Sequence, residues 1–187
     1  TTLATCTAED LGYEQGDQLA HRVSATTMSL PVFKRAQQVV ADGGAGLPDV
    51  DVGMAAFVVN RCSRSGIVCG AAGPIGGKNQ TGRWQVGARW NGPELAGRIR
   101  RLHAWWRHGR IRVMQGDGIG FLDDLAGSGF EDEMMAFCDP PYIGPGDRLY
   151  ERGMSADDHR RLAGALTACP ARWVLTYDQH PAVVNLY

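Results

Sequence analysis

A short apolar run that ends in an acid and two prolines constrains the fold of this chain more than any other segment. Residues 134–138 read Met-Met-Ala-Phe-Cys, and Asp139, Pro140, Pro141 and Tyr142 follow them directly. Such a run predicts a buried strand. Because proline fixes φ and donates no backbone hydrogen bond, the chain must leave the sheet there in a rigid, extended path. We therefore predict the edge of a functional site at this point.

These four residues suit an aromatic amine as the substrate. Such an amine is a poor nucleophile, because its lone pair is delocalised into the ring. The carboxylate of Asp139 and the carbonyl of Pro140 can accept both N–H bonds and localise the lone pair, while Tyr142 offers a flat face for stacking. We expect Asp139, Pro140, Pro141 and Tyr142 to be the catalytic residues.

The hydrophobic pattern predicts a helical first part and an α/β second part. Helices are expected near residues 31–41, 54–61 and 93–108, with a glycine-rich loop over 66–82. Strands at 112–115, 134–138 and 172–176 then alternate with helices near 120–125 and 156–168, the latter begun by a capping box of Ser155 and Asp158. The first thirty residues show no clear period. We predict a boundary between residues 110 and 111.

An acidic residue stands beside the end of each predicted strand, and these are Asp117, Asp139 and Asp178. Ligands of doubly wound parallel sheets bind at the carboxyl ends of the strands, so the three acids could share one cleft. Asp139 is the firmest member of the set. The sequence leaves open whether Asp117 lies in the cleft or in a loop. Asp178 is interpreted as a loop acid.

The net charge of −1 hides an uneven distribution. Residues 83–112 contain eight arginines and one acid, whereas residues 113–139 contain acids but no lysine or arginine. A basic segment with several tryptophans favours phosphate contact and base stacking. The alternative is a solvated helix, since Leu95, Ile99, Leu102 and Trp106 recur at helical spacing. We assign about half of the arginines to that outer face, and Lys78, Arg83 and Arg89 to DNA binding.

The five cysteines are scattered and odd in number, which argues against a disulfide framework and favours a reducing compartment. We expect a cytoplasmic or nucleoid-associated location. Cys62 and Cys69 have no neighbouring ligand pair, so we expect no metal site. No apolar run approaches the ~20 residues that cross a bilayer, and we expect no membrane partner. At 187 residues, the chain is long enough to bury a core.

The Asp-Pro-Pro-Tyr segment resembles the signature of S-adenosylmethionine-dependent amino-methyltransferases, and its first residue is the one usual in N6-adenine DNA methyltransferases. Residues 57–66, which include Asn60, Arg61 and Gly66, are similar to the Asn-Arg-x-x-x-x-Gly stretch of the Dam-type members of that family. Residues 82–87, 149–150, 154–163 and 177–187 resemble further family segments. Trp84 and Gln85 replace a Phe and an Asn there.

One family segment is absent. The Phe-x-Gly-x-Gly turn that binds S-adenosylmethionine should precede these motifs, and residues 116–120 are glycine-rich but stand in the wrong order. The first residue is Thr and not Met, and the family normally continues past Tyr187, so both ends of the chain look truncated. From the resemblance we expect Asp117, Gly118 and Asp139 to border the cofactor, and these 187 residues alone to bind it weakly or not at all and to transfer no methyl group.

The resemblance implies a Rossmann-like methyltransferase fold with a helical target-recognition lobe, and methyl transfer to the N6 amine of adenine in double-stranded DNA after base flipping. Asn60, Arg61, Lys78, Arg83 and Arg89 are the expected DNA-binding residues. Two alternatives stay open: a methyltransferase for RNA or a protein amide, and a non-catalytic DNA-binding remnant. Neither the recognition sequence nor the biological role, whether restriction-modification, phage defence or housekeeping, follows from these residues.

Overall fold

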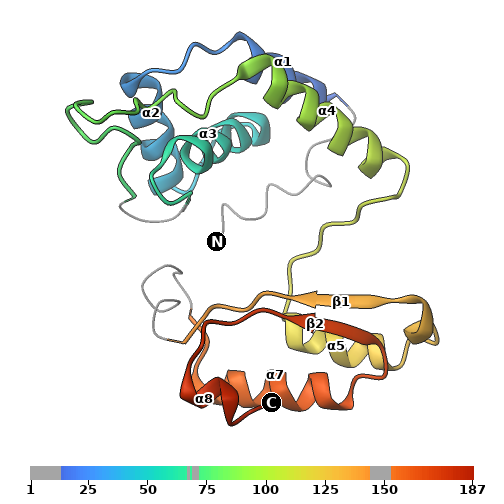
Figure 1. Cartoon of the computed structure of the whole chain (residues 1–187). Coiled ribbons are helices and arrows are strands. Elements are labelled where there is room, and N and C mark those ends of the chain that lie inside the picture. Colours follow the sequence, from blue (N-terminus) through green and yellow to red (C-terminus); the bar gives the residue numbers. More distant parts are fainter. Residues whose placement is uncertain (1–13, 67, 69–71, 144–152) are drawn as a thin grey trace. The chain divides into compact units, whose positions relative to one another are not determined.

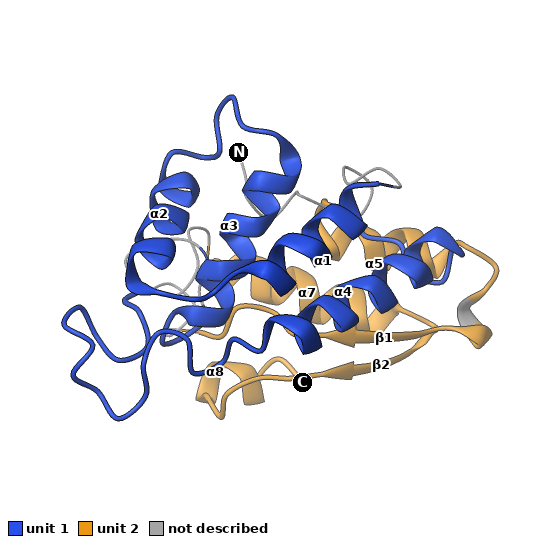
Figure 2. Ribbon diagram, turned by 90° about the horizontal axis from the view of Figure 1, so that it is seen from above, with its two compact units in different colours: residues 1–114 blue, residues 115–187 orange. Residues whose placement is uncertain are grey.

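The computed structural model describes residues 14–66, 68, 72–143 and 153–187. The chain divides into two compact units, Thr1–Met114 and Gln115–Tyr187 (Figure 2). The division falls four residues beyond the boundary expected between residues 110 and 111. Each unit has hydrophobic clusters of its own and is described by itself.

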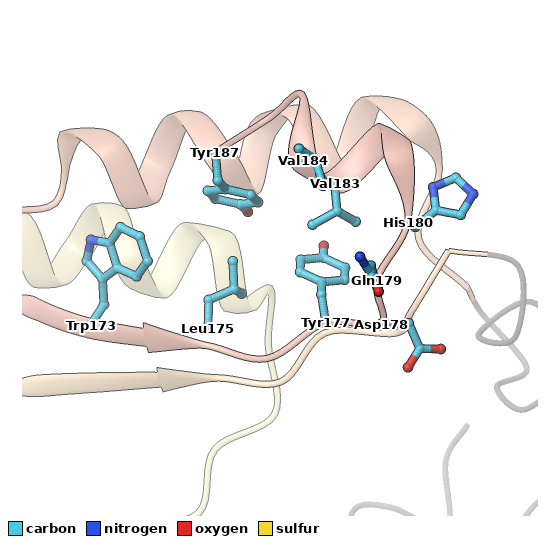
Figure 3. Close-up of a pocket in the computed structure, with 9 residues that line it drawn as sticks. All are labelled: Trp173, Leu175, Tyr177, Asp178, Gln179, His180, Val183, Val184 and Tyr187. Atoms are coloured by element: carbon cyan, nitrogen blue, oxygen red, sulfur yellow. The ribbon is translucent and has the colours of Figure 1, made fainter.

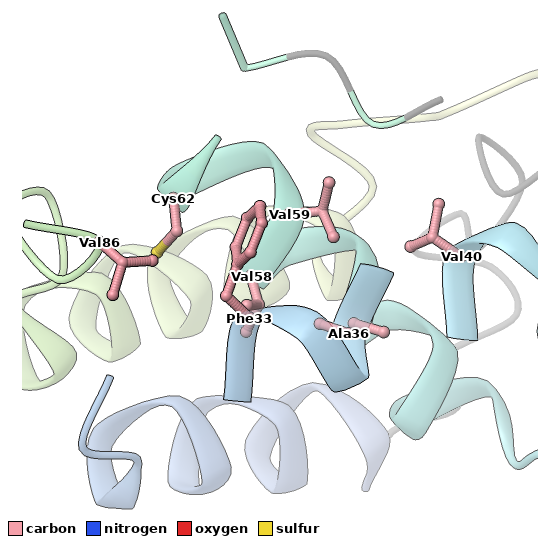
Figure 4. Packing of buried hydrophobic residues seen from close by; sticks show 8 residues of the cluster. Phe33, Ala36, Val40, Val58, Val59, Cys62 and Val86 are labelled. Carbon is pink, nitrogen blue, oxygen red and sulfur yellow. The ribbon is translucent and has the colours of Figure 1, made fainter. Parts of the chain in front are cut away.

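The first unit is helical, with α1 (Gln15–Ala25), α2 (Leu30–Ala41), α3 (Asp49–Cys62) and α4 (Gly92–Arg107) (Figure 1). Helices α2 and α3 pack through small and branched side chains. Phe33, Ala36 and Val40 of α2 meet Val58, Val59 and Cys62 of α3, and Val86 from the following loop joins them (Figure 4). Leu19, Val23, Val50 and Leu95 form a second cluster, which joins α1 to α3 and α4.

The helix starts follow local rules. Helix α2 has Pro31 in its first turn, where the missing N–H is not needed. Helix α3 begins at Asp49, five residues before the predicted start at 54. Pro48 precedes it, Asp49 and Asp51 lie in its first turn, and Val50 and Val52 are buried. Acids in the first turn favour a helix because they face the positive end of its dipole. Helix α1 lies within the first thirty residues, for which no element was predicted.

The inward face of helix α4 includes Leu95, with Ile99 and Trp106 half-buried, as predicted, but it excludes Leu102. Its buried residues are Gly92, Leu95, Ala96 and His103, whereas Leu102 is 53% exposed. The expectation that Leu102 belongs to the apolar face was therefore wrong. Helix α1 packs on α4 through Leu95 and through His103, which lies against Gly16 of α1, and Leu102 lies outside this contact. Trp106 is half-buried and stacks on His103, with ring centroids 5.6 Å apart.

The second unit contains α5 (Gly118–Ala126), the short 3-10 helix η2 (Glu131–Glu133), β1 (Met135–Cys138), α7 (Ala156–Ala168), β2 (Arg172–Leu175) and α8 (Pro181–Val184). Strands β1 and β2 pair in parallel, with Met135 opposite Arg172 and Cys138 opposite Leu175. Helix α7 connects them and begins with the predicted capping box of Ser155 and Asp158. Its bounds and those of the two strands agree closely with the sequence pattern.

The two faces of this sheet differ. Helices α5 and α7 cover one face, where Ile119, Leu122, Leu162 and Leu166 pack against Ala136, Cys138 and Leu175; both helices lie on the same side of the strands in Figure 1. On the other face Met135 is 63% exposed and Phe137 is 67% exposed. A β-α-β unit of this kind occurs in doubly wound sheets, but two strands do not distinguish that architecture from others. The Rossmann-like fold therefore stays a prediction.

The expected strand at 112–115 is not formed. These residues run without regular secondary structure, and Val113 and Met114 are 37% and 60% exposed. A strand needs a hydrogen-bonded neighbour, and no described segment pairs with these residues. The prediction was wrong because two apolar residues between Arg112 and Gln115 give a strand-like pattern without a partner. Consequently Asp117 does not follow a strand but precedes helix α5.

Substitution of Gly16 tests whether α1 and α4 pack as closely as described. A Cβ atom built at Gly16 would lie 2.5 Å from Nδ1 of the buried His103, whereas nothing lies within 4 Å of a Cβ at Gly97 on α4. We expect Gly16→Ala to lower the free energy of unfolding by about 1–3 kcal/mol through overpacking. Gly97→Ala should raise it by up to ~1 kcal/mol, because alanine is the better helix former. Urea unfolding of both variants measures this, and equal stabilities would contradict the packing described.

Candidate functional site

The carboxylate of Asp139 is held in place at the carboxyl end of β1. Its Oδ1 accepts hydrogen bonds from Thr176 Oγ1 at 2.5 Å and from the Tyr142 hydroxyl at 3.2 Å. Thr176 also continues the strand pairing, since its N–H donates to the Cys138 carbonyl at 3.0 Å. Among the described residues none donates to the second oxygen, Oδ2. An exposed carboxylate with one oxygen fixed and the other available is suited to accept a hydrogen bond from a ligand.

Three further aromatic rings support Tyr142. Its ring centroid lies 5.9 Å from that of Tyr177, which in turn lies 5.6 Å from His159 and 6.3 Å from Tyr187. His159 on α7 is only 4% exposed, and its Nδ1 lies 2.6 Å from the Tyr177 hydroxyl. Burial and then the neighbouring Tyr187 raise the pKa of Tyr177 to about 12, so the phenol keeps its proton at neutral pH. His159 therefore orients the Tyr177 ring behind the site.

Asp117 has a different position from the one predicted. Its Oδ1 accepts the Ile119 N–H at 3.1 Å and caps α5, and its Oδ2 pairs with Arg161 Nη2 at 3.2 Å. Arg161 lies in the N-terminal half of α7, the helix that leads the chain back from the carboxyl end of β1 to the start of the parallel strand β2. The ion pair thus brings Asp117 to the same end of this unit as Asp139. Both of its oxygens, however, are already engaged.

Asp117 and Gly118 show no geometric feature that supports the S-adenosylmethionine site implied by the family resemblance. The Asp117 carboxylate already serves as a helix cap and an ion-pair partner, so a ribose hydroxyl would have to share an oxygen with the Ile119 N–H or with Arg161. Gly118 begins α5, and nothing lies within 4 Å of a Cβ built there, so the glycine forms no cradle that a side chain would fill. No step of a reaction is therefore assigned to these two residues.

Asn60 and Arg61 fasten the two ends of a long loop. Asn60 Nδ2 donates to the Gly66 carbonyl at 2.7 Å, near the beginning of the loop, and Arg61 Nη2 donates to the Arg89 carbonyl at 3.1 Å, near its end. Arg61 is half-buried, and its Nε is buried without a hydrogen-bond partner in the structure. Asn60 and Arg61, which were predicted to bind DNA, therefore form hydrogen bonds to the loop, and the structure assigns them the role of positioning it.

Gln80 organises the glycine-rich part of this loop. It has a φ of 53°, the positive value that glycine usually supplies. Its Nε2 donates to the carbonyls of Ile75 and Gly77 at 2.9 and 2.7 Å, and its Oε1 accepts the Val86 N–H at 2.8 Å. Gly76 has a φ of 85°, and a Cβ there would lie 2.6 Å from the Trp84 carbonyl. Sequence reasoning missed Gln80, although its place among glycines is a usable signal.

An open groove of about 430 Å³ lies on this loop, lined by Arg64, Ile75, Thr81, Trp84 and Arg89 together with three glycines. The chain has no acidic residue between positions 52 and 93. None of its cations there, Arg61, Arg64, Lys78, Arg83 and Arg89, forms an ion pair with a described carboxylate. On α4, by contrast, Arg98 pairs with Glu94 and Arg100 with Asp17. The loop cations are thus free to meet phosphate, as are Arg101, Arg110 and Arg112 outside the loop, which also form no ion pair with a described carboxylate.

A second pocket, of about 380 Å³, lies between β2 and α8. Its apolar and aromatic lining comes from Trp173, Leu175, Tyr177, Val183, Val184 and Tyr187, with Asp178 at its edge (Figure 3). Neither Asp139 nor Tyr142 lines it. Asp178 is exposed and follows β2 as a loop acid, so it does not share a described pocket with Asp139. We assign this pocket no role in the candidate site.

Cys62 lies beneath the loop and is fully buried. Burial raises the pKa of its thiol to about 11, although the charges of Arg61 and Arg89 act in the opposite direction. The thiol is therefore protonated at neutral pH and packs as a small apolar side chain. In the described part of the chain, no three His, Cys, Asp or Glu side chains are grouped so that they could hold a metal ion.

Comparison of the chain with protein-family models, with curated protein sequences and with solved structures finds no match. No helix among the described residues is both long enough and apolar enough to span a membrane. The functional interpretation therefore rests on the residues and geometry above.

The placement of Asp117 leads to a prediction about the cofactor. We expect the 187-residue chain to bind S-adenosylmethionine with a dissociation constant weaker than about 100 μM, because Asp117 is engaged and Gly118 forms no cradle. Isothermal titration calorimetry measures this, with Asp117→Asn as the comparison variant. A dissociation constant in the low micromolar range that weakens in Asp117→Asn would show that residues 116–120 hold the cofactor after all.

Proposed function

We propose that the chain supplies the amine-binding and DNA-binding residues of an N6-adenine DNA methyltransferase with a Rossmann-like catalytic core. The observation that carries this proposal is the arrangement at Asp139. The carboxylate stands at the end of a parallel strand, before two prolines and a tyrosine, with one oxygen held by Thr176 and Tyr142. The carboxyl ends of parallel strands are where ligands bind in such folds.

In the proposed reaction these residues prepare the amine. Oδ2 of Asp139 and the carbonyl of Pro140 accept the two N–H bonds of the adenine amine, so that its lone pair is localised and directed away from the ring. Tyr142 stacks on the base, and the aromatic contact with Tyr177 keeps its ring in place. Pro141 maintains the extended path between them. S-adenosylmethionine is the implied donor of the electrophilic methyl group.

The helical unit is proposed to hold the DNA. The adenine amine is buried by pairing and stacking in a duplex, so the base must be extruded while the flanking strand is held. Lys78, Arg83 and Arg89 are exposed on the glycine-rich loop and have no described carboxylate partner, which suits contact with phosphates. Asn60 and Arg61 contribute by fixing the loop. The proposed location is the cytoplasm or the nucleoid.

A second candidate, a non-catalytic DNA-binding module, is favoured by one specific observation, namely the engagement of Asp117 described above. A methyltransferase for RNA or a protein amide would share the Asp139 geometry. Two measurements distinguish the three candidate functions. One identifies the group that becomes methylated, and the other tests whether DNA binding depends on Asp139.

The direct test expresses the full product of the gene that encodes this chain in a bacterial host without adenine methylases, and measures N6-methyladenine in its DNA by mass spectrometry. We expect Asp139→Ala to lower the methylation rate by about 10²-fold or more, because a positioned acceptor is lost. Asp178→Ala, which removes the exposed acid after the neighbouring strand, is the matched control and should keep its activity. Retention of more than about a tenth of the rate in Asp139→Ala would refute the role of this carboxylate.

Thr176 is proposed as a positioning residue for Asp139. Thr176→Val removes the hydroxyl and keeps the shape, so we expect kcat to fall about tenfold while KM for DNA stays unchanged, as for the loss of one hydrogen bond to a charged group. Thr176→Ser keeps the hydroxyl and should restore most of kcat. If valine and serine variants lose the same activity, the threonine acts only through packing.

A further inference from the structure

The loop groove joins an exposed aromatic ring to unpaired cations. Trp84 is 62% exposed, and the Arg83 guanidinium carbon lies 5.3 Å from the centroid of its ring. Arg64 and Arg89 line the same groove, together with the Thr81 side chain. A large indole that remains in water next to positive charge is the combination that binds a nucleobase and its phosphate.

The groove is held open by its own backbone. Gly82 N–H donates to the Gly76 carbonyl at 3.2 Å, and a Cβ at Gly82 would lie only 3.0 Å from Gly76 Cα. Ile75 and Val86, which are 9% and 4% exposed, anchor the loop on the helical unit. The groove is therefore built before any ligand arrives, so little ordering has to accompany binding.

We propose that this groove is a binding site for one unstacked nucleotide of a DNA strand, with the base stacked on Trp84 and the phosphate on Arg64 and Arg89. The proposal deepens the proposed function and rests on it for the identity of the ligand as DNA. The site differs from the amine site, because it contains no carboxylate and Asp139 does not line it. It accepts any base, since stacking on an indole uses the ring face that all bases share.

The cations outside the groove support this choice of ligand. Arg98 on α4 is exposed but hydrogen-bonded to Glu94 at 2.5 Å, so its charge is already compensated. Trp105 on α4 is 46% exposed, yet it lies outside the groove. These two residues resemble Arg64 and Trp84 in type and exposure but lack the groove, so they provide matched controls.

The test uses the 187-residue chain and a fluorescently labelled oligo(dT) of about ten nucleotides, with binding followed by anisotropy. Thymine has no exocyclic amine, so the amine site at Asp139 does not contribute. We expect Trp84→Ala to weaken oligo(dT) binding about tenfold, Trp84→Phe to keep most of it, and Trp105→Ala to have no effect. Arg64→Ala should weaken binding and lower the salt slope by about 0.7, whereas Arg98→Ala should not.

An abasic oligonucleotide of the same length separates stacking from charge. It should bind the wild type about tenfold more weakly than oligo(dT), and Trp84→Ala should not weaken it further. Equal binding of the two oligonucleotides by the wild type, or unchanged oligo(dT) binding by Trp84→Ala, would overturn the proposal and leave a site for phosphate alone. Circular dichroism checks that each variant is folded.

The outcome is independent of methyl transfer. If Trp84→Ala leaves oligo(dT) binding unchanged while adenine is still methylated, the nucleotide site is contradicted and the proposed function stands. The opposite result, with oligo(dT) binding dependent on Trp84 but no methylated adenine, would contradict the proposed reaction and leave a DNA-binding module. Asp139→Ala should bind oligo(dT) as the wild type does.

Discussion

The parallel pairing of β1 with β2 is the constraint on which the candidate site depends. Its register sets Cys138 opposite Leu175, so the next residues along the two strands, Asp139 and Thr176, meet beyond the end of the sheet. The Thr176 N–H then reaches the Cys138 carbonyl, and its hydroxyl reaches the carboxylate. A slip of one residue would turn Thr176 to the opposite face and release Asp139. The chemistry proposed for the site therefore follows from backbone hydrogen bonds.

In the helical unit, the corresponding constraint is a pair of hydrogen bonds that hold one long loop at both of its ends. Asn60 and Arg61 are adjacent at the end of α3, and they hold carbonyls that are 23 residues apart in sequence, those of Gly66 and Arg89. Gln80 closes the middle of the loop with three further hydrogen bonds. A long loop would otherwise carry many conformations, and its cations would not converge on one groove. The structure thus accounts for Asn60 and Arg61 as residues that hold the loop, and not as direct DNA contacts.

The charge distribution separates the two roles that arginine plays in this chain. On α4 and α7, exposed arginines form ion pairs with acids three or four residues away in the sequence. Such surface ion pairs contribute little to stability. On the loop the acids are absent, so the cations repel one another unless an anion is bound. This difference could not be read from the net charge of −1, which averages over both regions.

The sequence by itself determined the local elements and the composition of the candidate site. Helices at α2, α4 and α7, strands β1 and β2, and the Ser155 capping box follow from periodicity, proline placement and side-chain caps, which act within a few residues. Tertiary structure alone decided the rest. Val113 and Met114 found no strand to pair with, Leu102 lies outside the contact between α1 and α4, and the Asp117 carboxylate is paired with Arg161 of α7. Each of these outcomes depends on a partner distant in sequence, and neither spacing nor residue type specifies that partner.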